Sequence, residues 1–284
     1  MKREPLDLSH RELLAGRLRA VDTALSEYSF ANLYLFRDNH RYEVLFDGDD
    51  VFVAGLTYDG ARFIMPARNV DPACVERLAA LLAEFDIIFP VPEPWLPLFP
   101  APRFAHAYSD GDTDYVYTIE KMSTYPGKKL HKKRNLMKQY EELYEHEEFP
   151  LTDDRIADAR AVLEEWQTDM GVPPRETDYR SCVEALERYE ELALCGGIYY
   201  AAGQPAGFIL GEELDAKTFA LHFAKGLRRF KGVYQFMYNS FARIMPAQYC
   251  CLNFEQDLGR EALRQAKTSY VPDQLLRKYR VRLR

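Results

Sequence analysis

The chain has 284 residues, and its 44 acidic side chains outnumber its 37 lysines and arginines, which gives a net charge of −7. This balance excludes a protein that coats nucleic acid over its whole surface, so any anionic partner must be held by a local basic patch. The five cysteines are odd in number and show no C-x-x-C spacing, which favours reduced thiols over a disulfide framework or a zinc site.

The first half of the chain predicts a helix, a group of strands and a second helix. Its opening residues, MKREPLDLSHRELL, contain no apolar signal segment. Hydrophobic periodicity indicates a helix over 9–25, and alternation between turn signals indicates strands within 41–65. A helix over 72–85 follows, then the short strand DIIFP, a proline-rich loop over 90–102 and a strand over 114–122.

The second half begins with helices and continues with strands. Helices are predicted over 128–145, 153–170 and 177–192, and the last two are acidic. The strands IYYAA, GFILGEEL and TFALHFA come next, followed by a helix over 232–245, the strand YCCLNFE and a helix over 260–270. The chain ends in the basic segment QLLRKYRVRLR, which we interpret as a tail.

This order predicts an α/β (α+β) fold with two domains of related build, residues 1–124 and 125–284. Each domain is expected to hold a mixed, mostly antiparallel sheet flanked by helices. No uninterrupted apolar run reaches the ~18 residues of a membrane-spanning helix. We therefore expect a cytoplasmic protein, and peripheral contact with a membrane surface stays open.

The sequence GKKLHKKRN opens the helix predicted over 128–145 and concentrates positive charge at its start. On a helix, Lys129 and Lys133 fall in the middle of the apolar face, whereas Lys128 and Lys132 point away. The inward pair either extends past the edge of the core or lines a cleft that holds an anion. Cations in a first helical turn are disfavoured by a few tenths of a kcal/mol unless an anion is present, which favours the cleft.

A second basic cluster lies in HFAKGLRRFKG, where a predicted strand leads through a short loop into a helix. Its cations are Lys225, Arg228, Arg229 and Lys231, and the helix is expected to start at Gly232. A strand, a basic loop containing glycine and a helix N-terminus can together hold a phosphate. The alternative is a solvated loop that is basic by composition.

The segment NFEQDLG supplies the candidate acid–base residues. Glu255 and Asp257 follow a predicted strand two residues apart and are expected to share a face, so one of them could remove a proton. Alternatively, Asp257 caps the next helix or pairs with Arg260 or Arg264. No G-x-S-x-G motif and no histidine pair at metal-ligand spacing is present, and we predict no metal.

The residues predicted to bind an anionic substrate come from both basic clusters, from two polar side chains at a helix start, from the strand YCCLNFE and from the helix over 260–270. They are Lys129, Lys132, Lys133, Arg134, Asn135, Arg228, Arg229, Lys231, Gly232, Tyr234, Gln235, Asn253 and Lys267.

The second half resembles the GNAT acyltransferase fold, in which an R-x-x-G-x-G/A loop holds the pyrophosphate of acetyl-CoA. Arg229 and Gly232 match the loop, and Tyr234 stands where a small residue is expected. A tyrosine there would crowd a pyrophosphate.

A closer resemblance is to a bacterial family of tandem GNAT-like proteins, similar to the C-terminal domain of phosphatidylglycerol lysyltransferases and more distantly to Fem peptidyltransferases. The stretches that carry it are YSFANLYLFRDNHRYEV, GKKLHKKRN, HFAKGLRRFKGVYQFMYNSFA and LNFEQDLGREALRQAKTSYVPDQLLRKYR. The resemblance implies two tandem GNAT-like domains and an aminoacyl-tRNA donor in place of acyl-CoA. It also implies transfer to an amine or hydroxyl acceptor, such as a phospholipid head group.

Three functions are therefore open. The first is an aminoacyl- or acyltransferase that uses aminoacyl-tRNA or, as the weaker alternative, acyl-CoA. The second is a binding or regulatory module that has kept the GNAT-like fold without catalysis, which Tyr234 motivates. The third is a peripheral phospholipid-binding protein that uses the basic tail, a segment that could equally contact tRNA phosphates or be solvated.

Overall fold

The computed structural model describes residues 1–284 and separates by contacts into two compact units. Unit 1 comprises 1–115, 255–264 and 275–284, and unit 2 comprises 116–254 and 265–274. The chain thus passes between the units four times. The domain division at residues 124 and 125 stays a prediction, and it did not anticipate that late segments of the chain join the first unit.

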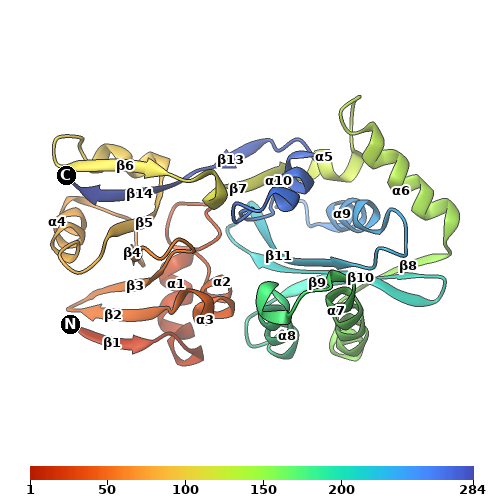
Figure 1. Ribbon diagram of the computed structural model, residues 1–284, viewed down its shortest axis with the longest axis horizontal. Helices are drawn as coiled ribbons and strands as arrows, with labels where there is room; N and C mark the ends of the chain where they lie inside the picture. Colours follow the sequence, from red (N-terminus) through yellow and green to blue (C-terminus); the bar gives the residue numbers. More distant parts are fainter. The chain divides into compact units, whose positions relative to one another are not determined.

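Unit 1 is built on a seven-stranded sheet in the order β1-β2-β3-β4-β5-β14-β6 (Figure 1). Its strands are β1 (Lys2–Pro5), β2 (Glu43–Asp47), β3 (Asp50–Leu56), β4 (Arg62–Pro66), β5 (Ile87–Pro92), β6 (Phe104–Tyr108) and β14 (Lys278–Leu283). All neighbours are antiparallel except β4 and β5. Its helices are α1 (Arg11–Arg19), α2 (Phe30–Leu35), α3 (Arg37–His40) and α4 (Pro72–Leu81), with 3-10 turns η1 (Leu8–His10), η2 (Glu93–Leu98) and η3 (Asp110–Asp112).

Local sequence explains much of unit 1. The strands predicted within 41–65 are present as β2, β3 and β4, and α4 begins where Asp71 accepts a hydrogen bond from the amide of Cys74 and Pro72 occupies the first turn. The helix predicted over 9–25 is present but shorter, since α1 spans only Arg11–Arg19. The helices α2 and α3 and the strand β6 were not predicted.

The C-terminal segment forms a strand of the first sheet, so the prediction that it is a tail is wrong. β14 lies between β5 and β6 and pairs antiparallel with both. Lys278 is fully buried, and Arg280 forms ion pairs with Asp59 and Asp112. Two of the five cations of this segment are therefore paired within unit 1, whereas Arg277, Arg282 and Arg284 are exposed.

The second sheet, most of which lies in unit 2, has the order β13-β7-β12-β11-β10-β9-β8. Its strands are β7 (Asp114–Thr118), β8 (His146–Pro150), β9 (Cys195–Ala201), β10 (Gln204–Glu213), β11 (Thr218–Gly226), β12 (Cys251–Asn253) and β13 (Gln274–Leu276). Its helices are α5 (Ile119–Thr124), α6 (His131–Leu143), α7 (Ile156–Met170), α8 (Tyr179–Glu187), α9 (Val233–Ile244) and α10 (Glu261–Thr268), with η4 (Asp153–Arg155) and η5 (Pro174–Glu176).

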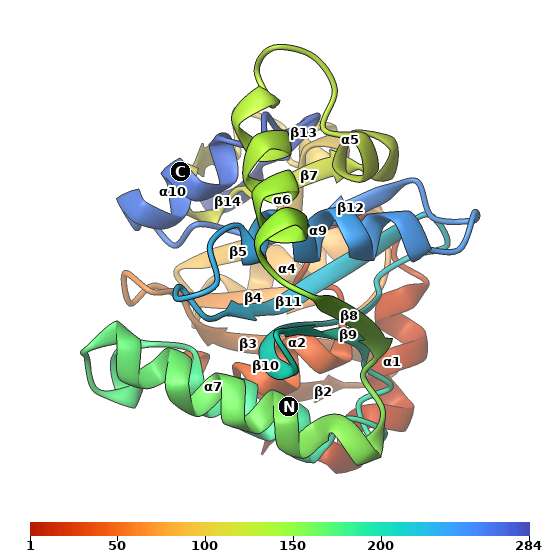
Figure 2. The ribbon, with the colours of Figure 1, turned by 90° about the vertical axis from the view of Figure 1, so that its right-hand side faces the viewer.

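Helices cover both faces of the second sheet. α6 and α9 lie on one side of it, and α7 lies on the other (Figures 1 and 2). The strands β9, β10 and β11 are antiparallel, whereas β11 and β12 are parallel and α9 connects them. This is the predicted order of two helices, three strands, a helix, a strand and a helix. The predicted fold class, two mixed sheets flanked by helices, is confirmed.

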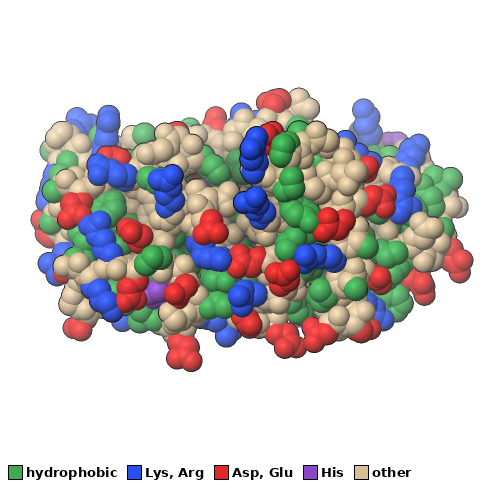
Figure 3. All heavy atoms as spheres, turned by 60° about the horizontal axis from the view of Figure 1, so that its bottom comes forward, with side chains coloured by type: hydrophobic (Ala, Val, Ile, Leu, Met, Phe, Trp, Pro, Cys, Tyr) green, Lys and Arg blue, Asp and Glu red, His purple; other side chains and the backbone are tan.

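The surface carries both signs of charge. Basic and acidic side chains are interspersed on the face drawn in Figure 3, without one continuous basic area. No helix combines the length and the apolar character that crossing a bilayer requires.

Candidate functional site

The start of α6 lies three residues later than predicted. Residues 127–130 form a turn that begins at Gly127, whose φ is +72°, and the helix starts at His131. Lys129 lies in this turn and is exposed, so the prediction that it faces inward is wrong. Lys133, in the first helical turn, is half-buried as predicted.

Lys133 rests on an aromatic ring rather than on a carboxylate. Its Nζ lies 3.8 Å from the ring centroid of Tyr270, which is itself buried. No ion pair in the structure includes Lys133, and burial lowers the pKa of its ammonium group. The cation is therefore partly desolvated and compensated only by the ring.

Tyr270 connects Lys133 to the start of α9. Its hydroxyl accepts a hydrogen bond of 3.0 Å from Nε2 of Gln235, and the carbonyl of Gln235 accepts one of 2.9 Å from the hydroxyl of Tyr125. Burial raises the pKa of Tyr270, so its phenol stays protonated at neutral pH. This arrangement supplies hydrogen-bond donors and does not supply a base.

Lys267 bonds to another member of the same aromatic group. Its Nζ donates a hydrogen bond of 2.6 Å to the carbonyl of Phe254, directly after β12. The ring of Tyr238 packs against both Phe254 and Tyr270, with centroids 4.8 and 5.5 Å apart. We call Lys133, Gln235, Lys267 and Tyr270 the lysine–tyrosine cluster. It unites four side chains of unit 2, three of which the sequence predicted.

The neighbours of Lys133 on α6 have different roles. Arg134 donates hydrogen bonds to the carbonyls of Tyr125 and Gly127 and so closes the turn before the helix. With Gly127, Lys128 and His131 it lines a shallow, open depression. Lys132 and Asn135, which were also predicted to bind substrate, are exposed.

The second basic cluster is partly neutralised by acidic side chains. Arg229 forms an ion pair of 2.6 Å with Glu165 of α7 and donates a hydrogen bond to Gln204. Arg228 and Lys231 are exposed. The cluster therefore offers less positive charge to a ligand than its sequence indicated.

Lys225, on the adjoining strand, is also neutralised. It is buried, contacts both carboxylate oxygens of Asp178 and lies 3.8 Å from the ring of Trp166.

Gly232 lies at the start of α9, as predicted. A glycine is required there by the packing of α9 against α6. Its φ is +88°, and a Cβ atom there would lie 2.1 Å from the carbonyl oxygen of Leu136 in α6. Only glycine lets the backbones of the two helices approach this closely. The first turn of α9 therefore faces the middle of α6, and half-buried Tyr234 follows Gly232. This crowding is unlike the open loop that a CoA pyrophosphate needs.

The pair Glu255 and Asp257 does not share a face, contrary to prediction. β12 ends at Asn253, and Glu255 has a φ of +58°, so strand alternation does not continue. Oε1 of Glu255 accepts a hydrogen bond of 2.8 Å from Asn32. Buried Asn253 belongs to β12 itself.

Asp257 pairs with Arg264, which was the predicted alternative to an acid–base role. The two groups form hydrogen bonds of 2.8 and 3.1 Å, and the carboxylate also accepts from the hydroxyl of Tyr115 and the amide of Gly259. Burial opposes ionisation, but these bonds bring the pKa of Asp257 below its ordinary value. A carboxylate so well satisfied is a poor general base.

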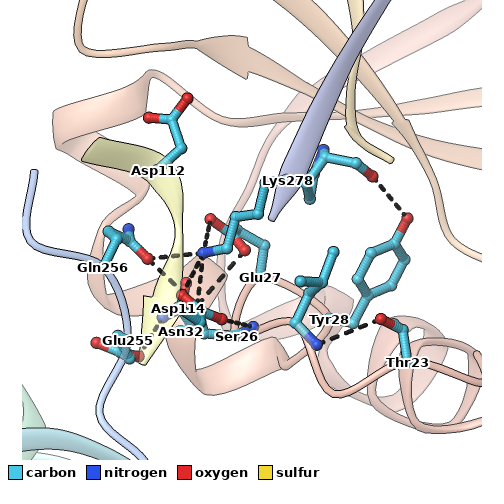
Figure 4. A network of polar contacts seen from close by, with 12 residues as sticks. Thr23, Ser26, Glu27, Tyr28, Asn32, Asp112, Asp114, Glu255, Gln256 and Lys278 are labelled. Carbon is cyan, nitrogen blue, oxygen red and sulfur yellow. Dashed lines mark hydrogen bonds and ion pairs between the residues drawn. The ribbon is translucent and has the colours of Figure 1, made fainter. Parts of the chain in front are cut away.

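Unit 1 contains a buried ionic network that was not predicted from the sequence (Figure 4). Nζ of Lys278 lies 2.7 Å from Glu27, 2.6 Å from Asp114, 3.0 Å from Ser26 and 2.7 Å from Gln256. Lys278 and Asp114 are fully buried, and Glu27 is 6% exposed. These five residues, which we call the Lys278 network, join β14 to the segment before α2, to β7 and to the segment after β12.

Two carboxylates face one ammonium group in the Lys278 network. Burial and the charge of Asp114 raise the pKa of Glu27 to about 7, although Lys278 opposes the shift. Burial alone would lower the pKa of Lys278, but the two carboxylates raise it, so the lysine stays charged. No sequence signal marked this network, because Lys278 reads as one cation in a basic tail.

Comparison with known proteins decides the family. The model of the family described as phosphatidylglycerol lysyltransferase, C-terminal, matches residues 18–282. The chain belongs to this family. The resemblance predicted from the residues is thereby confirmed.

Individual relatives of this family member are distant in sequence. A conserved protein of unknown function from Bacteroides thetaiotaomicron is 26% identical, with full coverage of both chains and a TM-score of 0.88. L-PGS from Bacillus licheniformis is 13% identical, covers 98% of this chain and 92% of its own, and has a TM-score of 0.65, which shows a common fold.

A curated relative is an uncharacterized protein of Mycoplasmoides gallisepticum, 22% identical over 180 residues. The match covers 61% of this chain and 57% of that protein, so the chain spans little more than half of that relative's length.

Proposed function

We propose that the protein is an aminoacyltransferase that moves an aminoacyl group from a charged tRNA to an amine or hydroxyl acceptor, such as a phospholipid head group. Membership of the phosphatidylglycerol lysyltransferase C-terminal family supports the reaction class. The observation that carries the proposal is the half-buried ammonium of Lys133, which has an aromatic ring beneath it and no carboxylate beside it. Such a cation is stabilised when an anion binds.

The surroundings of Lys133 favour a nucleic-acid donor over acyl-CoA. The carbonyl of Leu136 crowds Gly232 at the loop where GNAT enzymes hold a pyrophosphate, and Tyr234 replaces a small residue there. By contrast, half-buried Tyr238 presents part of an aromatic ring next to buried Tyr270, the ring that Lys133 covers. Phosphates beside ammonium groups and bases on aromatic rings are the usual contacts of single-stranded RNA ends.

In the proposed reaction the acceptor attacks the ester carbonyl and the ribose hydroxyl leaves. Lys133 and Lys267 neutralise phosphates of the donor, while Gln235 positions Tyr270. Holding the ester in place lowers the entropic cost of the attack. The proton of the acceptor passes to the ribose oxygen as this oxygen leaves.

A transfer assay tests the proposal. Purified protein is offered tRNA charged with labelled amino acids, or labelled acyl-CoA, together with phosphatidylglycerol vesicles or soluble amines. We expect label to move from tRNA and not from acyl-CoA. Lys133→Met should lower kcat/KM about tenfold, the effect of losing one charged hydrogen bond. It should also reduce the salt dependence of tRNA binding by about one phosphate contact.

The matched control is Lys138→Met, which removes an exposed cation from a later turn of the same helix. It should leave kcat/KM nearly unchanged. If the protein neither binds charged tRNA nor transfers label from it, the proposal is wrong. Binding without transfer to any acceptor would instead support a non-catalytic module.

A further inference from the structure

Two adjacent cysteines in unit 2 bring their sulfur atoms close together. The Sγ atoms of Cys250 and Cys251 lie 3.7 Å apart, and both thiols are free. Cys250 is exposed, and Cys251 is half-buried at the start of β12. The proposed transfer reaction uses neither of them.

The backbone holds both sulfur atoms on one side. In an extended strand, successive side chains point to opposite faces. Here the amides of Cys250 and Cys251 both donate to the carbonyl of Lys217, at 2.8 and 3.1 Å, so the peptide between them is not extended. The carbonyl of Cys250 also accepts a hydrogen bond of 2.9 Å from Ile119. The thiol pair is therefore fixed on a folded backbone.

The number of available ligands limits what this pair can bind. No group of three or more histidine, cysteine, aspartate or glutamate side chains in the structure could hold a metal ion. Structural zinc takes four protein ligands, so it does not fit two thiols. An occupant must be thiophilic and satisfied by two sulfur atoms, which is the coordination that an arsenic(III) centre with one organic group requires.

We propose that Cys250 and Cys251 form a dithiol binding site for trivalent organoarsenicals. Both S–H bonds break and two As–S bonds form on one arsenic atom. The arsenic-bound oxygen takes up the two protons and leaves as water. Arsenic stays trivalent and sulfur is not oxidised, so the reaction needs no other reactant.

The protonation of the pair agrees with this chemistry. Burial and the contact with Cys250 raise the pKa of the Cys251 thiol to about 11. A thiol of this kind is a weak nucleophile toward peroxide or disulfides, which react with thiolates. Condensation with an arsenic-bound oxygen differs, because the leaving oxygen consumes the thiol protons.

Intact-mass spectrometry with phenylarsine oxide tests the proposal. The protein should gain the mass of one phenylarsine oxide less one water, which is one phenylarsenic group in place of two thiol hydrogens. The adduct should survive excess glutathione, a monothiol, and be removed by dithiothreitol, a dithiol. Cys250→Ser and Cys251→Ser should each abolish the glutathione-resistant adduct. C250S alters an exposed side chain, so it tests the site with little effect on packing.

The matched control is Cys195→Ser, which removes the other exposed cysteine of unit 2. It should keep the resistant adduct. Loss of the adduct in C195S, its persistence in C250S or C251S, or its removal by glutathione from the unaltered protein would overturn the proposal. The mass readout does not depend on aminoacyl transfer, so its failure and the failure of the proposed function are distinguishable.

Discussion

The Lys278 network makes the stability of unit 1 depend on pH, and Glu27→Gln should remove that dependence. With Lys278 charged and both carboxylates ionised, the buried network carries one net negative charge. Protonation of Glu27 makes it neutral. Glutamine keeps the size and an oxygen that can accept from Lys278, but it stays neutral at every pH.

The raised pKa of Glu27 gives the sign and the magnitude of this pH dependence. Because the folded pKa of Glu27 is about 7 and its ordinary value is 4.5, the folded state retains a proton that the unfolded state releases between these values. The free energy of unfolding therefore falls as pH rises through this window. A difference of about 2.5 pKa units corresponds to about 3 kcal/mol at 1.36 kcal/mol per unit. Above about pH 7, Glu27→Gln should thus be more stable by up to about 3 kcal/mol, and near pH 4.5 the difference should vanish.

Urea unfolding from about pH 5 to about pH 8 measures this effect. The chain has two tryptophans, and Trp95 belongs to unit 1, where its ring lies 6.0 Å from that of Tyr28, next to Glu27. In a Trp166→Phe background, fluorescence therefore reports on unit 1. Exposed Glu12→Gln is the control and should leave the pH profile unchanged. Equal pH profiles for E27Q and the parent protein would refute the reasoning.

Four further substitutions test other parts of the structure. Lys278→Met leaves two buried carboxylates without a cation and should lower the free energy of unfolding by about 3–5 kcal/mol in chemical denaturation. Gly232→Ala should cost more than about 2 kcal/mol through positive φ and a clash with α6, whereas Gly127→Ala, with positive φ and open space, should cost about 1 kcal/mol. Asp257→Asn should lower the melting temperature, since Arg264 loses a charged partner, and a melt unchanged to within error would contradict that role.

Features set by local sequence could be predicted. The strands β2, β3 and β4 follow from alternation and turn residues, and α9 starts within one residue of its predicted position. The inward direction of Lys133 followed from helical periodicity alone. The direction of Lys129 was predicted wrongly, because a turn that begins at Gly127 makes the helix start later than predicted. Hydrophobic periodicity does not show where such a turn ends and the helix begins.

Features set by distant contacts could not be predicted. The position of β14 depends on pairing with β5 and β6, which are more than 150 residues earlier in the sequence. Its cations read as solvated, because nothing near Lys278 in the sequence announces Glu27 or Asp114. Similarly, the ion pair of Arg229 with Glu165 joins a loop to a helix far away along the chain. The candidate site was therefore partly predictable: three of its four residues were named, but their partners were not.

The position of β14 has a consequence for how the protein is made. Domains of most multidomain chains fold as they leave the ribosome, with the N-terminal one first. Unit 1 cannot do so, because β5 and β6 remain without the strand between them until residue 283 has been synthesised. Unit 2 is almost complete earlier, since its sheet and helices need little beyond residue 274. The unit that contains the N-terminus is thus the last to close, and until then two unpaired strand edges are open to mispairing.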